Sequence, residues 1–232
     1  ICNGCTNARI QDNQAIFNGL DGFRVSSSAK IAMQKNRSVR NDSMGYRVIT
    51  GGDPEAAASI EKFLHNLAFD NGAGGFRMDR PEKVTFTGNI ATLNTSDGLR
   101  FRNNTGVSVN ASRITNNVSA INGGSGIVLS STSESVVIGD VRLEGNHAVD
   151  NNGDGIQIYS GIQFSSSKNN NTYNNVSGCG ISNEDEVDAA FLRHFMSVTG
   201  TPNDVCNEST GEVVVQLADT PSPVRITAAK PL

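Results

Sequence analysis

The sequence contains no Trp and no uninterrupted apolar run near 18 residues. A membrane-spanning helix needs a run of about that length, so we expect no membrane span, and no signal peptide is recognisable. Helical spacing of apolar residues is missing through most of the chain, which argues against leucine-rich and helical repeats. The chain also starts without Met. We therefore expect it to be a processed or excised part of something longer.

Cysteine is scarce as well, with four residues in the chain. Cys2 and Cys5 form a lone C-x-x-C without a second pair nearby, which gives only weak support to a zinc site. Cys179 and Cys206 flank a predicted helix and would make a reasonable disulfide. Such a bond would imply an oxidising compartment.

Positive charge is scarce in the second half of the chain. Residues 1–113 carry 14 Lys and Arg against 10 Asp and Glu, whereas residues 114–232 carry 5 against 13. The basic excess of the first half is too small to predict binding of duplex nucleic acid. It would suit a smaller anionic ligand bound along one face.

Small polar and turn-forming residues are abundant: 24 Gly, 27 Asn, and 39 Ser and Thr together. This composition indicates many short strands joined by tight turns. Nine N-x-S/T sequons also occur, an excess that is consistent with a glycosylated secretory protein. They start at Asn36, Asn41, Asn94, Asn103, Asn110, Asn117, Asn170, Asn175 and Asn207.

One pattern recurs along the chain. Each copy has an Asn, a second Asn five residues later and a Gly nine residues after the first Asn, with copies beginning at Asn13, Asn36, Asn66, Asn89, Asn117 and Asn146. A looser seventh copy begins at Asn170, and successive copies are 23 to 30 residues apart. A period of this size with constant internal spacing predicts a solenoid.

Apolar residues in each copy alternate with period two, as in Phe76 and Met78 or Ile156 and Ile158. Short strands with tight Asn and Gly turns predict a parallel β-helix in which each copy is one coil. In stacked coils the same Asn recurs about every 4.8 Å. There it can adopt the left-handed backbone conformation and pass amide hydrogen bonds from coil to coil. The Gly before the bulky residue is interpreted as a bend into the strand.

The repeat stops near residue 181, and we divide the chain into a β-helix over 1–182 and a cap over 183–232. "NEDEVDAAFLRHFMSV" predicts an amphipathic helix with Asn183 as N-cap. This helix would cover the open end of the solenoid, followed by a C-terminal strand or tail. The N-terminal end has no such cap, which leaves it open to assembly with another element.

Four consecutive copies place an Arg between two apolar residues, and the alternation turns that Arg outward. These residues are Arg24, Arg47, Arg77 and Arg100. We interpret the column either as an anion-binding track or as an ordinary surface ladder in which Asp21, Asp79 and Asp97 offset repulsion. A polyuronate presents one carboxylate per sugar at a rise close to the coil spacing, and Arg pairs with carboxylates as a bidentate fork. Val128 and Gln157 end the column.

The coils "NGLDGFRV", "DSMGYRVITGG" and "NLAFDNGAGGFRMD" resemble consecutive coils of family 9 pectate lyases over roughly residues 10–125. The resemblance implies a secreted, right-handed parallel β-helix that cleaves an acidic polysaccharide by β-elimination with calcium. Such a chain would be all-β, with about seven coils and a C-terminal capping helix. It implies polysaccharide binding by Arg24, Arg77 and Arg100. A secreted or cell-surface location follows from it.

This sequence departs from the family pattern at two positions. Of the family's calcium-binding aspartates only Asp21 is kept, and Arg24 stands where another ligand would be, so calcium is weakly supported. The family's catalytic Lys is replaced by Arg47, which the resemblance makes the candidate base. A non-catalytic structural or adhesive β-helix module therefore remains the alternative to a lyase.

The remaining titratable candidates share no spacing. His65, His147 and His194 are expected to be structural or exposed. Asp150 and Asp154 lie in turns that would suit calcium but match no complete calcium loop.

Overall fold

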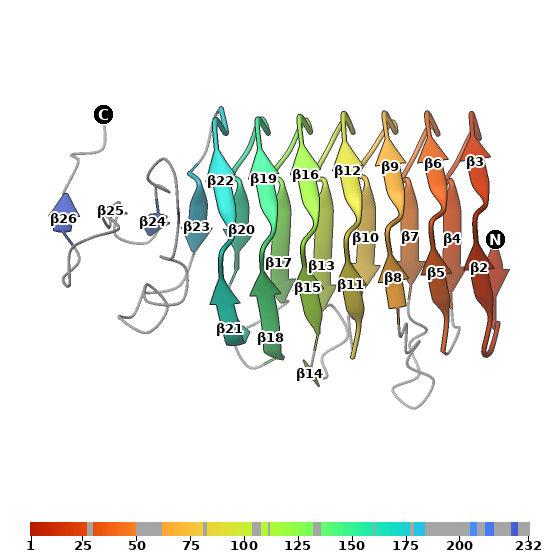
Figure 1. The fold of residues 1–232 in the computed structure, drawn as a ribbon, viewed down its shortest axis with the longest axis horizontal. Helices are drawn as coiled ribbons and strands as arrows, with labels where there is room; N and C mark the ends of the chain where they lie inside the picture. The colour runs from red at the N-terminus through yellow and green to blue at the C-terminus, as the bar shows by residue number, and fades with distance from the viewer. Residues whose placement is uncertain are drawn as a thin grey trace.

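The computed structural model describes residues 1–26, 30–49, 62–80, 83–103, 108–110, 112–131, 136–159, 161–176 and 179–183, and the strands at 205–207, 212–215 and 224–226. The described chain forms an all-β, right-handed parallel solenoid, which confirms the predicted fold class. In Figure 1 the coils stack along one axis from the N-terminal strands in red to the seventh coil in cyan.

Three sheets run along the solenoid (Figure 1). The first sheet contains β1 (Cys2–Asn3), β4 (Phe23–Ser26), β7 (Tyr46–Ile49), β10 (Phe76–Asp79), β13 (Leu99–Asn103), β17 (Ile127–Ser131), β20 (Ile156–Ile158), β23 (Ile181–Asn183), β24 (Val205–Asn207), β25 (Glu212–Val215) and β26 (Val224–Ile226). The second contains β2 (Arg9–Gln11), β5 (Ala32–Gln34), β8 (Lys62–Leu64), β11 (Thr85–Thr87), β14 (Val109–Asn110), β15 (Arg113–Thr115), β18 (Ile138–Glu144) and β21 (Ile162–Lys168). The third contains β3 (Gln14–Ile16), β6 (Arg37–Val39), β9 (Leu67–Phe69), β12 (Ile90–Thr92), β16 (Val118–Ala120), β19 (His147–Val149) and β22 (Asn171–Tyr173).

The seven strands of the third sheet correspond one to one with the seven sequence copies. Each begins directly after the first Asn of its copy, and neighbouring strands pair in parallel. We number the coils 1 to 7 by that Asn, from Asn13 to Asn170. The period read from the sequence is therefore the period of the solenoid.

Both Asn positions form continuous ladders through the coils. In each ladder the side-chain Oδ1 of one Asn accepts the backbone N–H of the Asn in the preceding coil at 2.9 to 3.2 Å. The same Oδ1 accepts the Nδ2–H of that Asn at 2.7 to 3.2 Å. From Asn36 to Asn151 these side chains are buried, so each bond is protected from water.

The predicted left-handed conformation of the ladder Asn is wrong. The residue before each Asn adopts it instead, for example Lys35 at φ 52°, Asp70 at φ 54° and Ile121 at φ 56°. The positive φ makes the bend, and the Asn that follows turns its side chain inward to the next coil. Residues of many types occupy the bend, so composition alone did not reveal it.

The Gly that precedes each first-sheet strand is required for close approach rather than for a bend. A Cβ on Gly75 would lie 2.7 Å from the carbonyl oxygen of Gly98 and 2.8 Å from the Cβ of Ala91. Such contacts are far shorter than a carbon atom tolerates. The small residue in the middle of each third-sheet strand, such as Ala68 or Ala91, is buried for the same reason.

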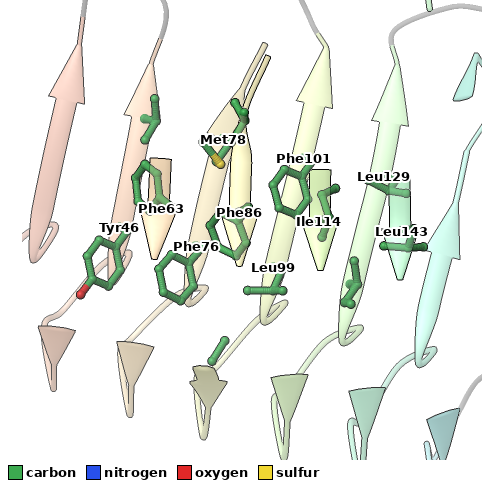
Figure 2. Packing of buried hydrophobic residues seen from close by; sticks show 14 of the residues in the cluster. Tyr46, Phe63, Phe76, Met78, Phe86, Leu99, Phe101, Ile114, Leu129 and Leu143 are labelled. Carbon is green, nitrogen blue, oxygen red and sulfur yellow. The ribbon is translucent and has the colours of Figure 1, made fainter. Parts of the chain in front are cut away.

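The core lies inside the coils. The large side chains labelled in Figure 2 come from the first and second sheets, and the third sheet adds small residues such as Ala68 and Ala91. Tyr46 stacks between Phe23 and Phe76, with ring centroids 5.0 and 4.4 Å away. Its hydroxyl donates a hydrogen bond to the Leu67 carbonyl at 3.2 Å, and burial raises the pKa of the Tyr46 phenol. Tyr46 is therefore a core residue and takes no part in surface chemistry.

The Asn ladders also explain the excess of sequons. Six of the nine begin at ladder positions: Asn36, Asn41, Asn94, Asn117, Asn170 and Asn175. Asn103 begins another and is fully buried. A glycan cannot be attached to a buried amide that is hydrogen-bonded on both sides. These seven sequons therefore give no support to glycosylation.

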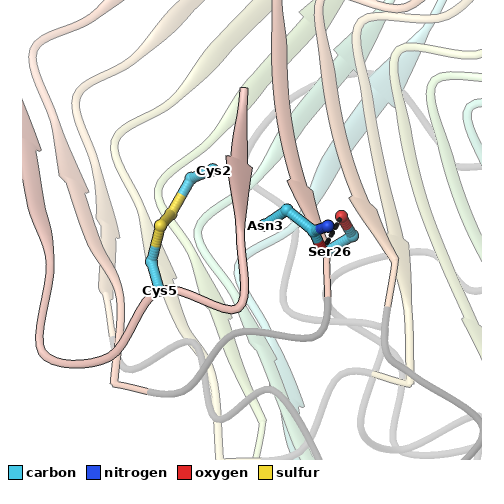
Figure 3. The surroundings of a disulfide bond; sticks show 4 residues. All are labelled: Cys2, Asn3, Cys5 and Ser26. Atoms are coloured by element: carbon cyan, nitrogen blue, oxygen red, sulfur yellow. Dashed lines mark hydrogen bonds between the residues drawn. A yellow bond between two sulfur atoms is a disulfide. The ribbon is translucent and has the colours of Figure 1, made fainter.

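At the N-terminal end Cys2 and Cys5 form a disulfide, and Asn3 accepts a hydrogen bond from Ser26 (Figure 3). The weakly supported zinc site is thus replaced by a covalent bond. At the other end β24 continues the first sheet in parallel, and β25 and β26 add antiparallel strands. The predicted capping helix, with His194, lies outside the described residues. Within the described part, no helix is long and apolar enough to cross a membrane.

Candidate functional site

The outer face of the first sheet brings the four predicted arginines together. Strand pairing sets Arg24 opposite Arg47, Arg47 opposite Arg77, and Arg77 opposite Arg100. Neighbouring positions in a sheet are about 4.8 Å apart, so the four residues form a column along the solenoid axis. We call these four residues the arginine column. It continues in register to Val128 and Gln157, where the positive charge ends.

The side chains of the column remain accessible to different degrees. Arg24 is exposed and forms no ion pair with any described residue. The side chains of Arg47, Arg77 and Arg100 keep 32%, 21% and 40% of their surface. This partial exposure leaves guanidinium N–H donors that an anion can reach.

Carboxylates from the preceding turns neutralise part of the column. Asp97 holds Arg100 with a 2.6 Å contact between Oδ2 and Nη2. Asp21, at the same position of coil 1, instead reaches Arg47 of the next coil, at 3.9 Å. The Nε atoms of Arg47 and Arg100 are buried and have no hydrogen-bond partner. The guanidinium groups are therefore fixed by their surroundings but incompletely satisfied.

Asp79 lies on β10, the same strand as Arg77, and it also neutralises part of the positive charge of the column. Its Oδ1 lies 3.3 Å from the Nε of Arg77 and 3.0 Å from the Nε of Arg102. Arg102 was missed in the sequence because it lies outside the repeated motif. The sequence does contain a signal for Arg102: the alternation of apolar and charged residues in "LRFR" puts it on the same outward face as Arg100.

Asp21 has a structural role that does not fit a calcium site. Its Oδ1 accepts the backbone N–H of Met44 at 3.2 Å, and its other oxygen faces Arg47. A calcium ion needs six to eight oxygen ligands, and a cation here would be repelled by the guanidinium. No group of three or more potential metal-ligating side chains occurs among the described residues.

The position of Asp21 belongs to a third ladder that sequence reasoning missed. In coil 4 the Oδ1 of Asp97 accepts the N–H of Ser125 at 3.0 Å, and in coil 5 the Ser125 hydroxyl accepts the N–H of Asp154 at 3.2 Å. Asp154 in turn accepts from the N–H of Cys179 and the hydroxyl of Ser182, both at 2.6 Å. Different residue types act as the same acceptor, which hid the ladder from a search for identical residues.

The other predicted candidates are not brought together. His65 is exposed at the bend before Asn66, His147 is exposed on the third sheet, and Asp150 is exposed at a bend of coil 6. Cys179 is disulfide-bonded. The side chain of Cys206 lies outside the described residues, so the predicted pairing of these two cysteines is not tested.

Comparisons with known proteins agree with this architecture. Residues 54–192 match the family model of the right handed beta helix region. Among solved structures, the chain is similar to the A-module of mannuronan C-5 epimerase AlgE4 from Azotobacter vinelandii, with a TM-score of 0.52 and 20% sequence identity. The match covers 77% of this chain and 50% of that module, so this chain spans about half the module's length. No curated protein sequence matched.

Proposed function

The chain belongs to the family of right-handed β-helix proteins, and on that premise we propose that it binds an acidic polysaccharide along the arginine column. The observation that carries this proposal is the register of Arg24, Arg47, Arg77 and Arg100 in four consecutive strands. A polyuronate lying along the axis would present one carboxylate to each guanidinium.

The charge balance of this face supports binding of an anion rather than a self-neutralised ladder. Five arginines, counting Arg102, face three carboxylates, and Arg24 has no ion-pair partner among the described residues. Unneutralised like charges at this spacing repel by up to about 1 kcal/mol per pair in water. A bound polyanion would relieve that repulsion. The structurally similar module is named as an epimerase of mannuronan, a polyuronate, which is in keeping with this ligand class.

The binding test uses oligomers of galacturonate, mannuronate and guluronate, two to six sugars long, in isothermal titration calorimetry. Affinity should rise with length up to about four sugars, one for each Arg of the column, and then level off because the next position is Val128. Arg77→Ala should weaken binding at least about tenfold, the loss of roughly one charge-assisted contact.

The matched control is Arg37→Ala, which removes an exposed arginine from the third sheet. It should leave affinity unchanged. Equal losses in Arg37→Ala and Arg77→Ala would mean that binding follows net charge alone and would overturn the proposed site.

Cleavage by β-elimination, with Arg47 as the base, is the finer form of this proposal. A charged guanidinium has no lone pair to accept the proton, so this role requires a neutral Arg47. Absorbance of unsaturated products, with and without added calcium, tests it across pH. Product formation that persists in Arg47→Ala would exclude Arg47, and no product from the wild type would leave a binding module. A secreted or cell-surface location is proposed because polyuronates occur outside cells.

A further inference from the structure

The large apolar side chains that are exposed to solvent gather on one face. Apart from Ile1, all those in the described part of the chain lie on the third sheet or in the turn that follows it. We call the following six residues the apolar strip: Ile16, Phe17, Ile90, Leu93, Ile121 and Tyr173, which keep 41% to 71% of their surface. The strip occupies coils 1, 4, 5 and 7, and exposed apolar residues gathered on one face mark an interaction site more often than scattered single residues do.

Three members of the strip are also in an unfavourable backbone conformation. Phe17, Leu93 and Ile121 occupy the bend with φ of 56°, 58° and 56°. Bulky and especially β-branched residues rarely adopt positive φ, while Asn and Asp tolerate it. Asp150 and Asn174 fill the same bend in coils 6 and 7. The fold therefore accepts a polar residue there, and the apolar choice lowers the stability of the isolated chain both by strain and by exposure.

The strip lies on a flat surface. The seven third-sheet strands are three residues long and pair residue for residue, and no register shift interrupts them. Six strand spacings of about 4.8 Å and strands of about 3.3 Å per residue give a face of roughly 30 by 13 Å. This is about 400 Å² in projection, half of the roughly 800 Å² per partner in a standard interface. It suits a weak, self-associating contact.

We propose that the apolar strip is the contact between two copies of this chain, packed face to face about a twofold axis parallel to the strands. This axis reverses the direction of the solenoid. Coil 1 of one copy therefore meets coil 7 of the other, and the two copies of coil 4 meet each other. Ile16 then lies opposite the partner copy's Tyr173, and Leu93 lies opposite its own equivalent. Ile90 also lies opposite its own equivalent, so four of the six strip residues meet an apolar partner, while Phe17 meets Asn174 and Ile121 meets Asp70.

The charges on the outer face of the third sheet favour a second copy of the chain as the partner and favour this direction of the twofold axis. The same axis sets Arg40, which holds Asp70 at 2.8 Å, opposite Asp150 of the other copy. A twofold axis along the solenoid would instead bring Arg37 and Arg40 of both copies together and would be repulsive.

Sedimentation velocity of the whole chain, from about 1 to about 200 μM, tests the proposal because an interface of this size gives a concentration-dependent dimer. The decisive variant is Leu93→Asn. It should raise the dissociation constant at least tenfold, because Leu93 lies opposite its own equivalent, and at the same time raise the thermal midpoint of the monomer, because the bend is relieved of strain. A purely structural role for this residue predicts the opposite change in stability.

A charge variant tests the orientation independently. Asp150→Arg should weaken the dimer, because it sets an arginine opposite Arg40. The control is Asp140→Arg, since Asp140 is also exposed and at positive φ but lies on the second sheet, in β18. It should leave association unchanged. A wild type that stays monomeric throughout, or a dimer that survives Leu93→Asn, would overturn the proposal. Neither result bears on polysaccharide binding.

Discussion

The outer faces of the first and third sheets are built on the same coils and carry different chemistry. The first presents arginines and carboxylates in register, and the third presents aliphatic and aromatic side chains together with the charged Arg37, Arg40 and Asp70. The Asn ladders flank the third sheet, and both sheets share one core, to which the first contributes large side chains and the third contributes small ones. The inward residues therefore fix the spacing of the coils, while the outward residues differ between the two faces.

The largest expected loss of stability comes from breaking an Asn ladder, because the stacking of the coils supports both outer faces. Asn89→Ala removes the acceptor for two donors of Asn66 and strips the Phe63 carbonyl of its partner. Several buried polar groups are then unsatisfied, so the free energy of unfolding should fall by about 3 to 5 kcal/mol. Urea unfolding followed by circular dichroism measures it. Asn174→Gly, at an exposed bend, is the control and should change stability by less than about 0.5 kcal/mol.

A second change breaks the stacking without removing a hydrogen-bonding group. Gly75→Ala forces a Cβ to within 2.7 Å of the Gly98 carbonyl oxygen, so coils 3 and 4 must separate. We expect a loss of about 2 to 4 kcal/mol in the free energy of unfolding. Gly19→Ala is the matched control, because the nearest atom to its Cβ would be 3.8 Å away. Equal losses in both variants would show that close approach is not the reason for the Gly.

These ladders also mark how far the sequence predicts the structure. The two Asn columns, the period and the register of the arginines followed from spacing, because a solenoid repeats its geometry in every coil. The bend residues did not follow, since Phe17, Leu93 and Ile121 override the ordinary preference for Asn or Gly at positive φ. The apolar strip, which includes these residues, was missed for the same reason.

The candidate site was predictable to a similar extent. Alternation gave the outward direction of the arginine column and the three carboxylates beside it. The acceptor ladder through Asp97, Ser125 and Asp154 was hidden, because aspartate and serine perform one task with different side chains. Asp21 is a backbone acceptor of the same kind in coil 1, a role that the spacing did not predict.

Two single substitutions should show that the first and third sheets act independently, one in oligouronate binding and the other in dimerisation. Arg77→Gln should weaken oligouronate binding about tenfold and leave dimerisation unchanged, since its charge lies only on the first sheet. Leu93→Asn should do the reverse. Calorimetric titration and sedimentation velocity on both variants measure the two properties. Loss of both properties in either variant would show that the faces are coupled rather than independent.

The smallest expected effect comes from a change that is confined to the charged face of the first sheet. Asp97→Asn removes the charge that holds Arg100 but keeps an oxygen to accept the N–H of Ser125. Because the Arg100 side chain is 40% exposed, solvent screening limits the loss in unfolding free energy to about 0.5 to 1 kcal/mol. The freed guanidinium should then bind a uronate carboxylate more strongly, and affinity should rise about two- to fivefold. A fall in affinity at constant stability would mean that Asp97 orients Arg100 for its ligand rather than competing with it.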